Sequence, residues 1–249
     1  MDRRLAIVSA VLVASLVSNV FLYELLVSEQ GRNVGIDGPT QKLVSAPKTT
    51  VRAPAITDDG KGAIIEISVE ILEGENQILM NTETLTGAIF QESARTAVRI
   101  ATTLSHVDLS GADVVFTITT DAEVVEGPSA GAAMTTLVYS AITSRAINQS
   151  VMMTGTIERD GSIGEVGSIM EKVEAASEVG IKTFLIPQGQ SIQTTWVRKE
   201  KILSFWVFNI VWVFYEPETI DLADYAIENF GVELVEVQDI GEVLSLALI

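Results

Sequence analysis

The 249-residue sequence contains no cysteine and a single histidine, His106. The absence of cysteine excludes disulfide bonds, thiolate nucleophiles and zinc–thiolate sites. One histidine cannot build a histidine-rich metal site, and a Ser-His-Asp triad would have to use His106. His106 follows the last turn of an expected helix at 86–104, where the helix dipole favours histidine. We therefore expect it to have a structural role.

Basic residues are also scarce, since 16 Lys and Arg stand against 33 Asp and Glu and give a formal net charge of −17. A chain this acidic repels the phosphate backbone, so nucleic acid is not an expected partner. Hydrophobic residues make up 47% of the sequence, which at this length supports one sizeable core. We expect one main domain with appendages.

A hydrophobic run at residues 5–27 carries a single charge, Glu24. Its 23 residues are enough to span a bilayer as one helix. Arg3 and Arg4 precede the run, so the positive-inside rule places the N-terminus in the cytoplasm and the rest of the chain outside it. We expect residues 1–27 to be a retained membrane anchor. A cleaved signal peptide and a buried core helix are the alternatives.

Residues 28–55 mix Gly, Pro, Ser and charge without periodicity, which is typical of a linker. From 56 to 249 the patterns of strands and helices alternate, which predicts an α+β (mixed α/β) domain. We expect strands at 62–72, 77–80, 113–120, 151–157, 184–187 and 232–237, and helices at 86–104, 132–142, 168–180 and 240–248. The first two strands are expected to form a hairpin that turns at Gly74 and Asn76.

The stretch 202–215, ILSFWVFNIVWVFY, is interrupted only by Ser204 and Asn209 and is too short to span a bilayer as a helix. It is either two strands turning at Asn209 or one core strand. In a third reading its aromatic residues form a surface that rests on the membrane or grips a partner. These aromatic residues are Trp206, Phe208, Trp212 and Phe214.

The segment EGPSAGAAM at 126–134 places Ser129 at a sharp turn from a strand into a helix. Unpaired backbone N–H groups at such a helix start can stabilise an oxyanion. Serine is also a favoured helix cap, so the motif alone does not make Ser129 a nucleophile. A nucleophilic serine needs a base, and without a usable histidine a lysine of lowered pKa is an option.

Lys172 fits the role of that base. It falls on the helix face of Ile169, Val173, Ala176 and Val179, whereas Glu171, Glu174 and Glu178 face the opposite way. Burial on the apolar face would lower the pKa of Lys172 toward that of a general base. The alternative is a lysine whose stem lies along the apolar face and whose ammonium reaches solvent.

Two segments, EGPSAGAAM at 126–134 and MTGTIERDGSIGEVGSIMEKVEAASEVGIKTFLIP at 153–187, resemble the proteolytic domain of Lon proteases. Ser129 and Lys172 fall on the family's catalytic serine and lysine, at the family's separation of 43 positions. The resemblance runs from about Gly62 to the C-terminus. It implies that Ser129 attacks the peptide carbonyl, Lys172 moves the proton and N–H groups from Gly127 to Ser129 hold the oxyanion. It also implies that Thr154 orients the ammonium.

The sequence departs from the family at several positions. Glu126 replaces the usual aspartate, which leaves its contact open, and Ser168 and Met170 replace a glycine and a lysine of the family's GGLKEK segment. The aromatic stretch belongs to an insertion at about 188–228. No G-x-x-x-x-G-K-[ST] phosphate-binding loop occurs in the sequence, so we expect no ATPase activity from this chain.

The leading hypothesis is a membrane-anchored, ATP-independent Ser-Lys endopeptidase without cofactor or metal, acting outside the cytoplasm on unfolded or accessible polypeptide segments. The resemblance suggests a homo-oligomer, commonly a hexameric ring. A non-catalytic Lon-like module for binding or assembly is the second hypothesis. A membrane structural protein that associates through the aromatic stretch is the third.

Overall fold

The computed structural model describes residues 41–249, except 82, 84, 121–123 and 206–207. The expected anchor at 1–27 and the expected linker up to residue 40 lie outside the described residues. Among the helices that are described, none is both long and apolar enough to cross a membrane.

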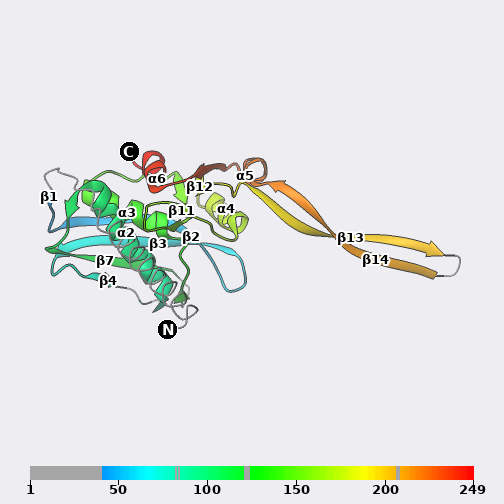
Figure 1. The fold of residues 1–249 in the computed structure, drawn as a ribbon, viewed down its shortest axis with the longest axis horizontal. Coiled ribbons are helices and arrows are strands. Elements are labelled where there is room, and N and C mark those ends of the chain that lie inside the picture. Colours follow the sequence, from blue (N-terminus) through cyan, green and yellow to red (C-terminus); the bar gives the residue numbers. More distant parts are fainter. Residues whose placement is uncertain (1–40, 82, 84, 121–123, 206–207) are drawn as a thin grey trace, which may run out of the picture. The chain divides into compact units, whose positions relative to one another are not determined.

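The largest sheet among the described residues has four strands in the order β2-β3-β7-β4 (Figure 1). Their bounds are Ala46–Ile56, Gly62–Glu73, Ala112–Thr119 and Ile78–Met80. Strand β3 pairs antiparallel with both β2 and β7, whereas β4 joins β7 in parallel. Every second residue of β3 from Ile65 to Ile71 is buried, as expected for a sheet with one face on the core.

Two helices pack together over the core side of this sheet, α2 (Ala88–Ser105) and α3 (Gly131–Thr143). Helix α3 is buried nearly all round, including Met134, Leu137 and Val138. A helix that is apolar on most sides is stable only inside a protein, and α3 accordingly lies in the main core.

The second sheet is parallel, in the order β15-β12-β9 (Glu233–Val237, Thr183–Pro187, Val151–Met153). Alternate residues separate its two faces. Met152 and Phe184 pack in a core with α4 (Ile169–Glu178) and α5 (Leu222–Phe230). Met153 and Leu185 belong to the core that includes α3 and α6 (Ile240–Ala247). This mixed α/β arrangement confirms the expected fold class for the described residues.

Three further pairs of short strands are formed by segments that connect the larger elements. They are β1 (Gln41–Lys42) with β6 (Val107–Asp108), β5 (Leu85–Thr86) with β8 (Val124–Val125), and β10 (Thr156–Ile157) with β11 (Ile163–Gly164).

A long antiparallel hairpin of β13 (Ile192–Phe205) and β14 (Phe208–Asp221) projects away from the two sheets (Figure 1). The prediction of a core strand at 202–215 is therefore wrong. The alternative of two strands is confirmed, but Asn209 is not the turn, because it pairs with Ser204 inside the ladder. The connection at 206–207 lies outside the described residues.

Two other expectations differ from the structure. Residues 46–55, expected in the linker, form most of β2. The hairpin expected between 62–72 and 77–80 is wrong, because β4 pairs with β7 and not with β3. The Asp113 carboxylate accepts hydrogen bonds from the N–H groups of Glu75 (2.9 Å) and Gln77 (2.8 Å), which fixes the intervening loop against the start of β7.

Candidate active site

The turn that carries Ser129 lies between β8 and α3. Gly127 has φ +97°, a conformation that glycine adopts without a steric penalty. The cap position of α3 is Ala130, and no side chain caps the helix, so Ser129 is not a helix cap. Neither the hydroxyl nor the backbone N–H of Ser129 has a hydrogen-bond partner among the described residues. Both groups are therefore available to a ligand.

Backbone contacts hold this turn against the segment that follows β9. The Gly155 N–H donates to the Ser129 carbonyl (3.0 Å), and the Ala132 N–H donates to the Gly155 carbonyl (3.1 Å). The start of α3 also lies close to β10, because a Cβ atom on Gly131 would be 2.6 Å from the Ile157 nitrogen. The position of Ser129 is thus fixed by its neighbours on both sides.

Lys172 lies on α4 with Ile169, Val173 and Ala176, and only 3% of its surface is exposed. The predicted inward orientation is confirmed, and the alternative of an ammonium reaching solvent is wrong for this structure. Burial lowers the pKa of Lys172 from its usual 10.5 to about 8, although the charge of Glu171 partly opposes that change. A lysine with such a pKa is partly neutral near physiological pH.

Thr154 connects Lys172 to the Ser129 turn. It follows β9 directly, it is buried, and its N–H donates to the Leu185 carbonyl (3.0 Å). The Lys172 Nζ donates to Thr154 Oγ1 (3.4 Å), and the same oxygen donates to the Ser129 carbonyl (3.4 Å). Both hydrogen bonds are long and therefore weak, but they run in one direction from the ammonium to the serine.

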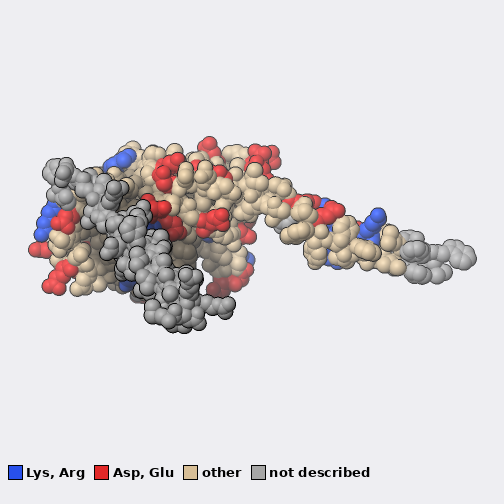
Figure 2. Space-filling view, viewed as in Figure 1, with Lys and Arg blue, Asp and Glu red and all other residues tan. Residues whose placement is uncertain are grey.

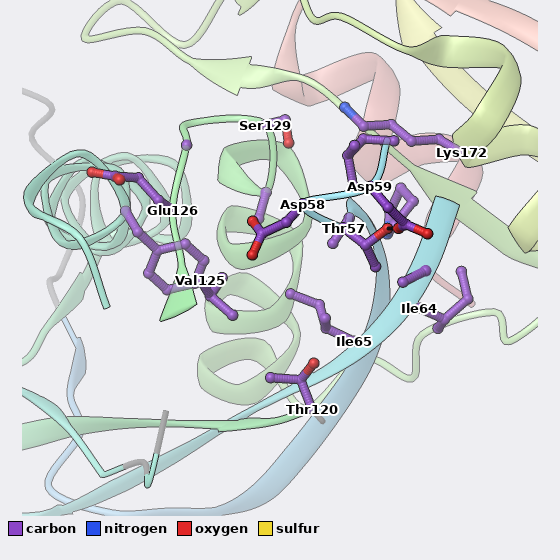
Figure 3. A pocket seen from close by; sticks show the side chains of 17 residues that line it. Thr57, Asp58, Asp59, Ile64, Ile65, Thr120, Val125, Glu126, Ser129 and Lys172 are labelled. Carbon is purple, nitrogen blue, oxygen red and sulfur yellow. Dashed lines mark hydrogen bonds between the residues drawn. The ribbon is translucent and has the colours of Figure 1, made fainter. Parts of the chain in front are cut away.

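Ser129 and Lys172 both line one cavity of about 770 Å³ (Figure 3). In Figure 3 the Lys172 nitrogen points toward the part of the cavity where Ser129 lies. The other walls are mostly apolar and come from β2, β3, α2 and β8, and they include Ile64, Ile65, Phe90 and Val125. The volume and the apolar lining are typical of a site that binds a few side chains.

Acidic side chains stand around this cavity. The turn between β2 and β3 contributes Asp58 and Asp59 to its lining. Hydrogen bonds from Lys61 and Thr57 lower the pKa of Asp59 to about 2, so this carboxylate is ionised at neutral pH. The contribution of β2 to the cavity was not predicted, because residues up to 55 were assigned to the linker. The Asp-Asp-Gly turn between two apolar segments was the available signal.

Glu126 and Gly127 also line the cavity, but the Glu126 carboxylate points away from Ser129 (Figure 3). A Cβ atom on Gly87 would be 2.4 Å from Glu126 Oε1, so the carboxylate lies against the N-terminal end of α2. The structure thus brings together Ser129, Lys172 and Thr154, with Gly127 in the same turn and Glu126 apart. His106 ends α2 with φ +55° and does not line the cavity, as the structural reading predicted.

The residues described contain no group of three or more His, Asp or Glu side chains placed to bind a metal ion. The arrangement offers instead a free hydroxyl, a partly neutral amine and a backbone N–H around one cavity. These groups can perform nucleophilic acyl transfer.

Comparison with known proteins identifies relatives of this domain. The family model of the Lon protease (S16) C-terminal proteolytic domain matches residues 49–200, more than half of the chain. The Lon protease of Methanosphaera stadtmanae is 34% identical over 149 residues, which cover 58% of this chain and 18% of that protein. The archaeal Lon protease of Methanothermobacter thermautotrophicus is 28% identical over 202 residues, covering 80% of this chain and 27% of the relative. The chain therefore spans about a quarter or less of the length of these relatives.

Proposed function

The chain belongs to the family of Lon protease C-terminal proteolytic domains, a family of serine peptidases, and we propose that Ser129 and Lys172 are its catalytic dyad. In this proposal Ser129 is the nucleophile and Lys172 is the general base. The observation that carries the proposal is the buried Lys172, whose pKa is lowered to about 8 and whose ammonium is linked through Thr154 to the Ser129 carbonyl.

The proposed reaction begins with neutral Lys172. Its Nζ removes the proton of the Ser129 hydroxyl while Oγ attacks the carbonyl carbon of the peptide. The oxyanion of the tetrahedral intermediate accepts hydrogen bonds from the backbone N–H groups of Gly127 and Ser129, since Pro128 between them has no N–H. The C–N bond then breaks, and the departing amine takes the proton from the Lys172 ammonium. A water molecule, deprotonated by Lys172, hydrolyses the acyl-enzyme and releases Ser129.

Thr154 is a positioning residue in this mechanism. Its hydroxyl accepts from the ammonium and donates to the Ser129 carbonyl, so it holds the amine near the turn of the nucleophile. The burial of Lys172 on the apolar face of α4 keeps the amine poorly solvated.

We also propose where the enzyme acts and that it needs no ATP. The absence of a phosphate-binding loop from the 249 residues is consistent with cleavage that needs no ATP, and such cleavage would be limited to unfolded or accessible segments. The apolar run at 5–27, with Arg3 and Arg4 before it, supports a membrane anchor and a catalytic domain outside the cytoplasm. A hexameric ring is carried over from the family resemblance alone.

The test is cleavage of unfolded casein by the full chain in detergent without nucleotide. Wild type should cleave, whereas Ser129→Ala and Lys172→Met should not. Lys182→Met is the matched control, because Lys182 is an exposed lysine ten positions away. If wild type is inactive, or if either dyad variant cleaves as well as wild type, the dyad is wrong and the non-catalytic hypothesis gains support. Addition of MgATP should not change the rate.

The pH dependence gives a second criterion. Only the neutral amine of Lys172 accepts a proton, so kcat/KM should fall about tenfold per pH unit below pH 8 and level off above it. A rate that is constant from pH 6 to pH 10 would contradict the role of Lys172.

A further inference from the structure

The hairpin β13–β14 exposes apolar residues on both of its faces. In an antiparallel pair, directly opposite residues share a face, so Ile202 lies with Val211 on one face and Leu203 lies with Ile210 on the other. Ile202 is 63% exposed, Val211 52% and Ile210 45%. A protein surface that packs on one face would leave the other face in water.

Charge divides the hairpin into two parts along its length. No charged residue occurs between Lys201 and Glu216, and this interval contains the distal end of both strands. In Figure 2 both basic and acidic side chains lie along the projecting hairpin before its grey end. From the Ile202–Val211 pair to the Phe205–Phe208 pair the ladder extends about 10 Å, at about 3.3 Å per residue.

Cations and aromatic rings face each other directly behind this end. Arg198 pairs with Tyr215, Lys199 with Phe214 and Lys201 with Trp212 across the two strands. Arg198 has an ion pair with Glu200 and Lys199 has one with Glu218, whereas Lys201 has none within the described part of the chain. Arg198 and Lys199 are thus neutralised by their acidic partners, and Lys201 is the cation of this segment that remains for an anionic ligand.

From this order of apolar, aromatic and basic residues along the hairpin we propose that the end of the β13–β14 hairpin docks on an anionic lipid bilayer. The apolar end enters the boundary between headgroups and acyl chains, which surrounds both faces of the ribbon at once. Trp212 and Tyr215 lie at headgroup depth, and Lys201 contacts lipid phosphates. Insertion stops at this depth, because the outer edges of a two-stranded ribbon carry unpaired N–H and C=O groups that hydrocarbon cannot satisfy.

This surface is separate from the proposed dyad and does not depend on it. The hairpin can also be observed independently of the expected anchor, since all three tryptophans of the chain, Trp196, Trp206 and Trp212, lie in the segment 196–212. The full chain can therefore be reconstituted in vesicles, and its tryptophan emission reports on the hairpin alone.

The experiment compares two single-tryptophan variants. W196F/W206F retains Trp212 at the boundary of the apolar end, and W206F/W212F retains Trp196 nearer the base. In vesicles of phosphatidylcholine and phosphatidylglycerol, acyl chains brominated near the glycerol end should quench Trp212 about twofold and shift its emission to the blue. Trp196, which lies beyond the charged segment, should be quenched far less by the brominated chains and more by aqueous acrylamide.

Charge provides the second comparison. Lys201→Glu should remove at least half of the Trp212 quenching by brominated lipid, as should omission of phosphatidylglycerol, whereas Lys182→Glu should leave it unchanged. Protection of Trp212 from acrylamide without quenching by brominated lipid would overturn the proposal in favour of a second copy or another protein. Free quenching by acrylamide in every vesicle would also overturn it. Casein cleavage measured in the same vesicles tests the dyad separately.

Discussion

Replacing Lys172 by methionine should stabilise the protein at neutral pH while it abolishes cleavage. Methionine has a similar length and no charge, so it fills the space of the lysine side chain without the cost of burying an ammonium. The lowered pKa of Lys172 is a measure of that cost, because it means that the folded state disfavours the protonated form. Because the protonated Lys172 is unfavourable for folding, its replacement by methionine should raise the free energy of unfolding.

The magnitude follows from the interval between the two pKa values. At about 1.4 kcal/mol per pH unit, the interval from about 8 in the folded chain to the usual 10.5 corresponds to about 3 kcal/mol. The variant loses the Lys172–Thr154 hydrogen bond, which is long and contributes about 0.5–1 kcal/mol. The expected net gain in the free energy of unfolding is therefore about 2 kcal/mol at pH 7.

The sign of the pH dependence is also determined. Below pH 8 the lysine is protonated in both states, and the full cost is present. Between pH 8 and 10.5 the folded lysine loses its proton while the unfolded one keeps it, so the stability of wild type rises with pH. The advantage of Lys172→Met should therefore shrink through this window and reach zero at about pH 10, where the remaining charge cost equals the contribution of the lost hydrogen bond.

Urea unfolding of the full chain in detergent, followed by far-UV circular dichroism at pH 7 and pH 10, measures this effect. The quantity of interest is the difference between variant and wild type, since other groups titrate in both. Lys182→Met controls for the loss of an exposed lysine and should show no pH-dependent difference. A net cost of burying the Lys172 ammonium would be contradicted if Lys172→Met is less stable than wild type at pH 7 and the difference is the same at pH 10.

Three further substitutions test neighbouring parts of the site. Thr154→Val should lower kcat for casein about 10- to 100-fold with little change in KM, and Thr154→Ser should restore most of it. Ser168 begins α4 with φ +55°, so Ser168→Gly should raise the free energy of unfolding by about 0.5–1 kcal/mol in urea titrations, and Ser168→Ala should not. Glu126→Gln should keep casein cleavage within about twofold and cost about 0.5 kcal/mol, because the carboxylate lies at the start of α2 and not at Ser129.

The parts of the fold that were predicted correctly are those with strong hydrophobic periodicity. Helices α2, α3, α4 and α6 and the central strands were predicted near their observed positions. Strand β2 was not, because it lies at the edge of its sheet and four of its 11 residues are polar. An edge strand tolerates Pro54 and charged residues that a central strand would exclude, so its sequence reads as a linker.

The pairing of β4 and the exposure of the β13–β14 hairpin were not predicted for the same reason. Periodicity reports which residues avoid water, but it does not report what covers them. Strand β4 cannot pair with β3, because β2 and β7 occupy both edges of β3, and the Asp113 side chain, which is distant in sequence, binds the loop before β4. One reading of the segment 202–215 placed it in the core because it is apolar, yet Ile202, Trp212 and Tyr215 are exposed in the folded chain.

The residues of the candidate site were easier to predict from the sequence than the pairing of the strands. A buried lysine among apolar residues contradicts the amphipathic pattern of its helix, and this contradiction is visible in the sequence. The Glu126 contact and the apolar walls from β2 and β3 were not accessible, because they depend on the positions of backbone segments far apart in the chain.

The cost of burying Lys172 and its proposed competence as a base are the same physical quantity. A lysine with its usual pKa of 10.5 has about 0.03% of its amine neutral at pH 7, whereas a pKa of about 8 makes about 10% neutral. The fraction that can accept a proton from Ser129 thus rises about 300-fold, and the free energy that disfavours the ammonium is what raises it. A variant that solvates Lys172 should therefore gain stability and lose activity at pH 7 together, and the activity should return as the pH approaches 10.5.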